Sequence, residues 1–559
     1  MAAFNLKRFR DLAFGRAPLP DHPMRSLEEA RRMLALLPED DSESSLADLT
    51  RWTVSMNGME AFTPGRRARV LMLIDDAART HWRALGARYL APHGVPTEYR
   101  DGDPAILRAL YDSASELANG FAITLDASEH SSQWVVENQA RLMIRSMRWL
   151  GRRLALAHML QAPHTPALWE LLHRRREIAE VRGMAATAMP AFEGVKYSTS
   201  VNREYLRALL LELAAPDSVR VRQVELIYRI AARIASTAKL EYGPTSETAF
   251  AVIPAGDARP VPVDRFKPGA AAPLYINTVN CLPRLRAALE RDMGRNPKDE
   301  DSLFGRGFTI HERNTAVARL LEYWGLNPPQ RRNRRIPLAL AARVVSGFSN
   351  VLGVVPTLAG IQSKQGSEAS RSALRLLLSE TSKSLKRSKV KAARVEPARV
   401  IDASAGGLGL AIRHADATWA KHGILLAVMI EPGKDWFVGV LRRIFSIDEE
   451  LRLGIQILSP KPRKILLYAP TTRDHMVWEE AIRGEKNFEE NFRHGILLEP
   501  QELPLAAADL LLPPGMVTKG SQFNLPLPSG QQRLSIARLH VDNEFFQRVL
   551  VESLGMART

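Results

Sequence analysis

Arg331-Arg332-Asn333-Arg334-Arg335 and Asp402-Ala403-Ser404-Ala405-Gly406-Gly407 are the two segments that decide the fold of this chain of 559 residues. The first contains the spacing RxxxR, and the second contains the spacing DxSxxG. Two arginines four residues apart can direct two planar guanidinium groups at phosphate oxygens, each through paired, charge-assisted hydrogen bonds. The pattern therefore indicates recognition of an anion and not catalysis.

Short strand-like runs separated by glycine, proline and charged turns surround these two segments. Such runs are typical of a small antiparallel barrel, which we expect at residues 327–470. The barrel is interrupted at about 347–395 by a basic insertion, in which residues 367–389 have the pattern of a helix. The predicted strands are residues 336–345, 399–402, 408–413, 423–430, 436–445, 451–458 and 464–468.

The chain before the arginines has a different periodicity. Apolar residues recur at helical spacing through most of residues 1–326, which predicts an all-α domain, with short extended pieces near residues 249–253. The proline-rich segment 325–329 stops the last helix and marks a domain boundary. After a charged helical stretch, β-like runs return, so residues 471–559 are predicted to form a smaller β-rich domain. The expected fold class is thus α+β and multidomain.

The order of motifs in residues 328–470 resembles the PilZ domain family. Arg331xxxArg335 precedes the first strand, Asp402xSer404xxGly407 lies on the next, and the runs Trp436-Phe-Val-Gly-Val-Leu-Arg442 and Leu453-Gly-Ile-Gln-Ile-Leu458 follow. PilZ domains are six-stranded antiparallel β-barrels that act as bacterial receptors for cyclic di-GMP. The resemblance implies the same fold and the same ligand for this part of the chain.

The resemblance also implies the roles of five residues. Arg331 and Arg335 would bind the phosphates and guanine edges, Asp402 and Ser404 would complete a polar cradle, and Gly407 would leave room for close approach. This agrees with the chemistry of the ligand, because guanine O6 and N7 suit a bidentate arginine. The connection departs from the family, since 66 residues separate Arg335 from Asp402. The insertion could cover this site, add positive charge to it or signal a degenerate domain.

Charge supports a second reading. The chain has a formal net charge of +16, and residues 331–400 carry 15 Lys or Arg against 3 Glu, which gives +12 in that segment. Such a segment could bind nucleic acid through its phosphates. Its single aromatic residue, Phe348, offers few platforms for stacking bases. A third reading is a helical scaffold with a degenerate PilZ-like barrel.

Catalytic, metal and membrane motifs are absent from the sequence. It has no GxxxxGK[ST] loop and no zinc-protease helix, and its one cysteine, Cys281, excludes an intrachain disulfide. No apolar run is long enough to span a bilayer. We therefore expect a cytoplasmic, non-enzymatic cyclic di-GMP effector without cofactor or metal. Ligand binding would reorder the arginine loop, and the helical domain would pass the change to a protein partner.

Overall fold

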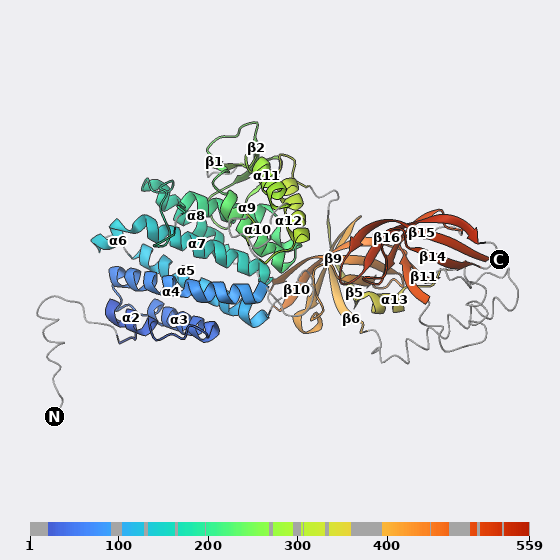
Figure 1. The fold of residues 1–559 in the computed structure, drawn as a ribbon, viewed down its shortest axis with the longest axis horizontal. Coiled ribbons are helices and arrows are strands. Elements are labelled where there is room, and N and C mark those ends of the chain that lie inside the picture. The colour runs from blue at the N-terminus through green and yellow to red at the C-terminus, as the bar shows by residue number, and fades with distance from the viewer. Residues whose placement is uncertain are drawn as a thin grey trace, which may run out of the picture. The chain divides into compact units, whose positions relative to one another are not determined.

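The computed structural model divides the chain into two compact units, residues 1–330 and 331–559, which we describe separately (Figure 1). The first unit is helical with a small sheet, and the second consists of two β-barrels. The expected α+β multidomain fold is confirmed. The structure describes residues 21–557 except 91–102, 128–131, 163–165, 196, 268–271, 294–302, 306, 330–334, 359–393, 448, 469–491, 500–503 and 528–529.

The helices of the first unit begin at residues whose side chains cap free backbone N–H groups. Ser26, Asp41, Asp103 and Ser200 each accept a hydrogen bond from the first turn of the helix that follows, and Thr309 forms a full capping box with Glu312. The helices are α2 (Leu27–Leu34), α3 (Ser42–Asn57), α4 (Pro64–Leu90), α5 (Pro104–Asp126), α6 (Gln133–Glu137), α7 (Gln139–Met159), α8 (Pro166–Val181), α9 (Val201–Leu213), α10 (Val221–Ile234), α11 (Cys281–Met293) and α12 (Ile310–Tyr323).

Helix α7 is the centre of this unit. It packs against α5, α8, α9 and α10, and α5 in turn packs against α3 and α4 (Figure 1). Most of its side chains are buried, including Leu142, Leu150 and the charged Arg145. A helix buried on nearly every side must satisfy any polar group it carries within the protein. This places a network of arginines and carboxylates inside the helical unit.

A small sheet accompanies the helices. Its strands are β1 (Lys239–Glu241), β2 (Thr248–Val252), β3 (Val261–Pro262) and β4 (Leu274–Asn277), in the order β1-β4-β2-β3. Buried Phe250, Val252 and Ile276 join the core of the helical unit. The short extended pieces predicted near residues 249–253 are confirmed.

The first barrel of the second unit is closed and antiparallel, with the strand order β10-β7-β6-β5-β8-β9. Apolar side chains at alternate positions fill its interior. Those of Leu408, Leu410 and Ile412 on β7 lie beside those of Leu453 and Ile455 on β10. The six-stranded barrel predicted from the sequence is confirmed. Its strands are β5 (Ile336–Ser346), β6 (Glu396–Ser404), β7 (Gly407–Arg413), β8 (Leu425–Ile430), β9 (Trp436–Ile447) and β10 (Glu450–Ser459).

The C-terminal β-rich region is a second closed six-stranded antiparallel barrel. Its strands are β11 (Arg463–Tyr468), β12 (Phe492–Leu497), β13 (Ala507–Leu512), β14 (Gln522–Leu527), β15 (Gly530–Asp542) and β16 (Gln547–Ala557), in the order β11-β12-β13-β16-β15-β14. The run at 464–468, which the sequence grouped with the first barrel, pairs here with β12 and β14. Its alternation fits either barrel, so pairing and not local pattern decides where it belongs.

A short helix, α13 (Phe348–Val354), joins the two barrels. Its residues Phe348, Val351 and Leu352 pack in one apolar cluster with Val440 of the first barrel and Leu511 of the second. The helix lies at the start of the predicted insertion. The predicted basic helix at 367–389 and nearly all of the charged stretch at 472–493 lie outside the described residues. None of the described helices has the length and apolarity needed to cross a membrane.

Candidate ligand-binding site

The predicted site lies where β5, β6 and β7 run side by side in the first barrel. Arg335 directly precedes β5, Asp402 and Ser404 lie on β6, and Gly407 opens β7. Arg331 lies outside the described residues. The register pairs Pro337 of β5 with Asp402, and Asp402 with Gly409 of β7, so the two predicted segments meet across neighbouring strands despite the insertion between them.

A β-bulge determines the direction of Asp402. Val400 is fully buried in the barrel interior, and in a regular strand a residue two positions later would point the same way. The pairing of β6 with β7 shifts register between Val400 and Asp402, which inserts one extra residue. Asp402 therefore lies on the outer face, while Ala403 packs against the interior.

Arg335 and Asp402 form an ion pair. An Nη1 hydrogen of Arg335 is donated to Oδ1 of Asp402, and the side chains remain 28% and 25% exposed. A guanidinium has five N–H donors, so one carboxylate fixes its orientation and leaves other donors for a ligand. The pair is thus a positioned cation that is open to solvent.

Ser404 and Gly407 lie at the end of the same β6–β7 pair. The hydroxyl of Ser404 donates a 3.3 Å hydrogen bond to the carbonyl oxygen of Gly407. A Cβ at Gly407 would lie 2.8 Å from the carbonyl oxygen of Ile455 on β10. The contact that requires glycine at this position in the structure is therefore with a neighbouring strand.

Three further residues complete this face and were not identified from the sequence. A Cβ at Gly409 would lie 2.6 Å from Oδ1 of Asp402, so this glycine makes the space that the carboxylate occupies. Across β10, Gly454 pairs with Gly409, and the stem of Arg443 lies over Gly454, 3.0 Å from where its Cβ would be. The alternation of the run Gly406-Gly407-Leu408-Gly409 was the signal that could have placed Gly409 beside Asp402.

The chemistry of this face is that of anion recognition. It presents two arginines, one carboxylate and one hydroxyl over strands kept bare by glycine. Among the described residues, no group of three or more His, Cys, Asp or Glu side chains could hold a metal ion. Planar guanidinium groups beside an accessible backbone suit phosphates and the acceptor edges of bases.

Comparison with known proteins gives one family match. Residues 28–246 match the family described as cyclic-di-GMP receptor FimW, N-terminal domain. This segment covers α2 to α10 and ends before the first barrel. None of the curated proteins matches the chain. The helical half of this chain is therefore similar to the N-terminal domain of a cyclic di-GMP receptor.

Proposed function

We propose that this protein is a non-enzymatic effector that binds cyclic di-GMP on the outer face of its first barrel. The observation that carries the proposal is the exposed ion pair between Arg335 and Asp402, which joins the two halves of the RxxxR and DxSxxG pattern. The match of residues 28–246 to a receptor domain supports it from an independent part of the chain.

The proposed site uses five residues predicted from the sequence. Arg335, oriented by Asp402, would donate to a phosphate or to guanine O6 and N7, and Arg331 would contribute the second guanidinium. Ser404 has a hydroxyl at the end of the β6–β7 pair, and Gly407 keeps the strand free of a side chain. We add Gly409, because its missing side chain holds the space in which Asp402 lies.

The proposed response to the ligand is a reordering of the arginine loop that precedes β5. The helical unit would pass this change to a protein partner, by shifting the populations of two loop arrangements that bind the ligand with different affinity. Hydrogen exchange tests the relay. If saturating cyclic di-GMP leaves exchange in α2 to α12 unchanged, the relay is wrong even where binding is observed.

Replacing Arg335 with alanine should weaken binding of cyclic di-GMP by about 10- to 100-fold, because it removes charge-assisted hydrogen bonds worth about 1.5–3 kcal/mol. Isothermal titration calorimetry of the full chain measures this loss. Arg343→Ala is the matched control, since Arg343 lies on β5, the strand that Arg335 precedes, in an exposed ion pair with Glu431 and outside the proposed site.

The same titration separates the alternatives. Saturable, guanine-selective binding that is lost in Arg335→Ala and kept in Arg343→Ala supports the effector. Binding of any polyanion that disappears at moderate salt supports a nucleic-acid-binding protein instead. The absence of binding to either ligand would favour a helical scaffold with a degenerate barrel.

Replacing Gly409 with alanine should lower the affinity for cyclic di-GMP by about tenfold and change stability little. The new Cβ would lie within 3 Å of three atoms of the Asp402 carboxyl group, so the carboxylate must move and release Arg335. The partly exposed side chain of Asp402 can move at small cost, whereas a ligand contact depends on the position of the groups that make it.

Calorimetry and thermal unfolding of the same protein measure both parts of this result. Gly353→Ala in α13 is the control, because a Cβ there would meet nothing within 4 Å. Unchanged affinity in Gly409→Ala would show that the position of Asp402 does not matter for the ligand.

A further inference from the structure

A second arginine-rich site lies in the helical unit, in a cavity of about 250 Å³. No acidic side chain is among the described residues that line it. It lies within the segment that matches the receptor domain, and no residue of the barrel site takes part in it. Its five arginines come from three helices: Arg79 and Arg83 from α4, Arg148 and Arg152 from α7, and Arg207 from α9.

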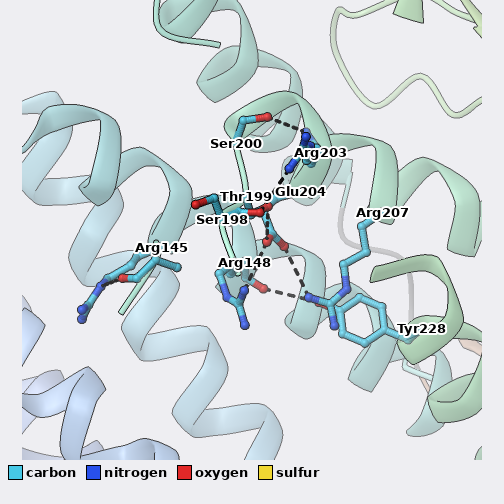
Figure 2. Close-up of polar contacts among 10 residues, drawn as sticks. Arg145, Arg148, Ser198, Thr199, Ser200, Arg203, Glu204, Arg207 and Tyr228 are labelled. Carbon is cyan, nitrogen blue, oxygen red and sulfur yellow. Dashed lines mark hydrogen bonds and ion pairs between the residues drawn. The ribbon is translucent and has the colours of Figure 1, made fainter. Parts of the chain in front are cut away.

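Carboxylates behind the cavity neutralise some of these arginines. Glu204 accepts hydrogen bonds from Arg148 and Arg207 at 3.2 and 3.3 Å (Figure 2). Glu225 accepts from Arg152 at 2.5 Å and from Arg229 outside the cavity at 2.7 Å.

The cluster nevertheless keeps an excess of positive charge. Asp75 and Asp76 pair with the adjacent buried Arg145. When Arg145 and Arg229 are counted with the five cavity arginines, there are seven guanidinium groups. The carboxylates that pair with them are four: Asp75, Asp76, Glu204 and Glu225.

Two of the cavity arginines contribute most of that excess. Arg79 and Arg83 lie one helical turn apart on α4, and neither forms an ion pair with another residue in the described part of the chain. Burial, and then the charge of Arg83, lower the pKa of Arg79. Like charges held one turn apart destabilise a helix, and a bound anion between them would remove that cost.

Aromatic rings hold the guanidinium groups in place. The guanidinium of Arg79 lies 4.1 Å from the ring centre of Phe192, and that of Arg148 lies 5.2 Å from it. The guanidinium of Arg207 lies 3.6 Å from the ring centre of Tyr228. A guanidinium stacked on a ring keeps N–H groups at its edge for hydrogen bonds, so these contacts prepare the cations for a ligand.

We propose that this cavity binds the phosphates of a nucleoside diphosphate. Its volume is smaller than that of most sites for whole organic ligands and is suited to a pair of phosphate groups. A neighbouring cavity of about 460 Å³ shares Trp82, Arg83 and Arg152 with it and is otherwise lined mainly by apolar side chains such as Leu107 and Leu156. The base lies in this second cavity against Trp82, and the phosphates lie among the arginines.

Titration of GDP and of inorganic pyrophosphate into the full-length Arg335→Ala variant tests the proposal, because this variant lacks the central arginine of the barrel site. At physiological salt we expect saturable binding of GDP, several-fold tighter than that of pyrophosphate. Adding Arg83→Gln should weaken GDP binding at least tenfold. Arg83 is exposed, so the substitution leaves the fold intact.

Arg88→Gln is the matched control, since Arg88 is an exposed arginine of the same helix that pairs with Glu43 outside both cavities. No saturable binding of GDP, or an equal loss in Arg88→Gln, overturns the proposal. Equal affinities for GDP and pyrophosphate overturn the placement of the base. Either failure is distinct from a failure of the barrel site, which is tested with cyclic di-GMP and intact Arg335.

Discussion

Replacing Arg145 with methionine is expected to destabilise the helical unit by about 3–5 kcal/mol, because it leaves a buried carboxylate without its cation. Arg145 and Asp75 are both 0% exposed, and their ion pair measures 3.1 Å. Burial already raises the pKa of Asp75 to about 6 against the opposing charge of Arg145. Without that charge, either the Asp75 carboxylate takes up a proton or the surrounding helices unfold and expose it to water.

Arg145 also connects segments that are distant in the sequence. Its Nε donates to the carbonyl oxygen of Ala191 at 2.8 Å, and its Nη2 donates to Asp76 at 3.0 Å. Phe192 lies against the guanidinium, 4.4 Å from the ring centre. The substitution therefore removes a hydrogen bond to a backbone acceptor as well as the ion pairs with two carboxylates, which places the expected loss at the upper end for single substitutions.

Urea unfolding of the full chain, followed by hydrogen exchange in α4 and α7, measures this loss. Arg141→Met, one turn earlier on α7 and only partly buried, is the control and should cost well under 1 kcal/mol. Asp75→Asn should recover part of the loss when combined with Arg145→Met, because it removes the stranded charge. Equal losses in Arg145→Met and Arg141→Met would show that the network contributes little.

The helical unit is also expected to lose about 3 kcal/mol of stability as the pH rises from 6.5 to 9. His158, at the end of α7, is 1% exposed and lies 2.7 Å from Asp217 and 3.1 Å from Glu212. Burial lowers the pKa of this imidazole, but the hydrogen bonds and charges of the two carboxylates outweigh it and raise the pKa to about 9.

The direction of this pH dependence follows from the proton that His158 binds. The folded protein binds the proton more tightly than the unfolded chain, in which the pKa of histidine is near 6.5. The stabilising contribution is therefore complete below pH 6.5 and is lost as the pH rises through 9. His158 holds the pKa of Glu212 below its usual value although burial opposes this, so that carboxylate destabilises the fold in acid as it becomes protonated.

Urea unfolding of the full chain between pH 6 and 9.5, followed by hydrogen exchange in α7 and α9, measures how the free energy of unfolding changes with pH. His158→Gln is the comparison, because an amide of similar reach can donate to a carboxylate but does not titrate. In the second barrel, burial lowers the pKa of His494 to about 4, so the pH dependence that this residue contributes has the opposite sign: stability rises as the pH increases through 6.5, where the unfolded chain loses its proton. If the same loss of stability with rising pH persists in His158→Gln, other titratable groups cause it.

Much of the fold follows from the sequence because periodicity reports burial directly. The helical spacing before residue 325 and the alternation after Arg335 each describe a buried face, as on α5 and β10, although α7 and β7 are buried on nearly every side. The assignment of β11 to a barrel depends on pairing between strands far apart in the chain, and local alternation carries no information about it. The closure of the second barrel could not be predicted for the same reason, because it also depends on pairing between distant strands.

The site could be predicted in part for a related reason. Arg335 and Asp402 could be named because their residue types carry the chemistry, and the structure brings them together. Gly409 has no functional group, so its role appears when the position of the Asp402 carboxylate is known. Arg79 and Arg145 look like surface arginines in the sequence, since helical spacing does not show which cations are enclosed.

The extra residue in β6, between Val400 and Asp402, has a consequence for the meaning of the DxSxxG pattern. Motif residues at a fixed spacing lie on the outer face of a sheet only when the strand that carries them begins in the correct register. A relative that kept every letter of the pattern but lacked the bulge would direct its carboxylate toward the barrel interior and would have no such site. The direction of the Asp402 carboxylate therefore depends on the number of residues before the motif as much as on the motif itself.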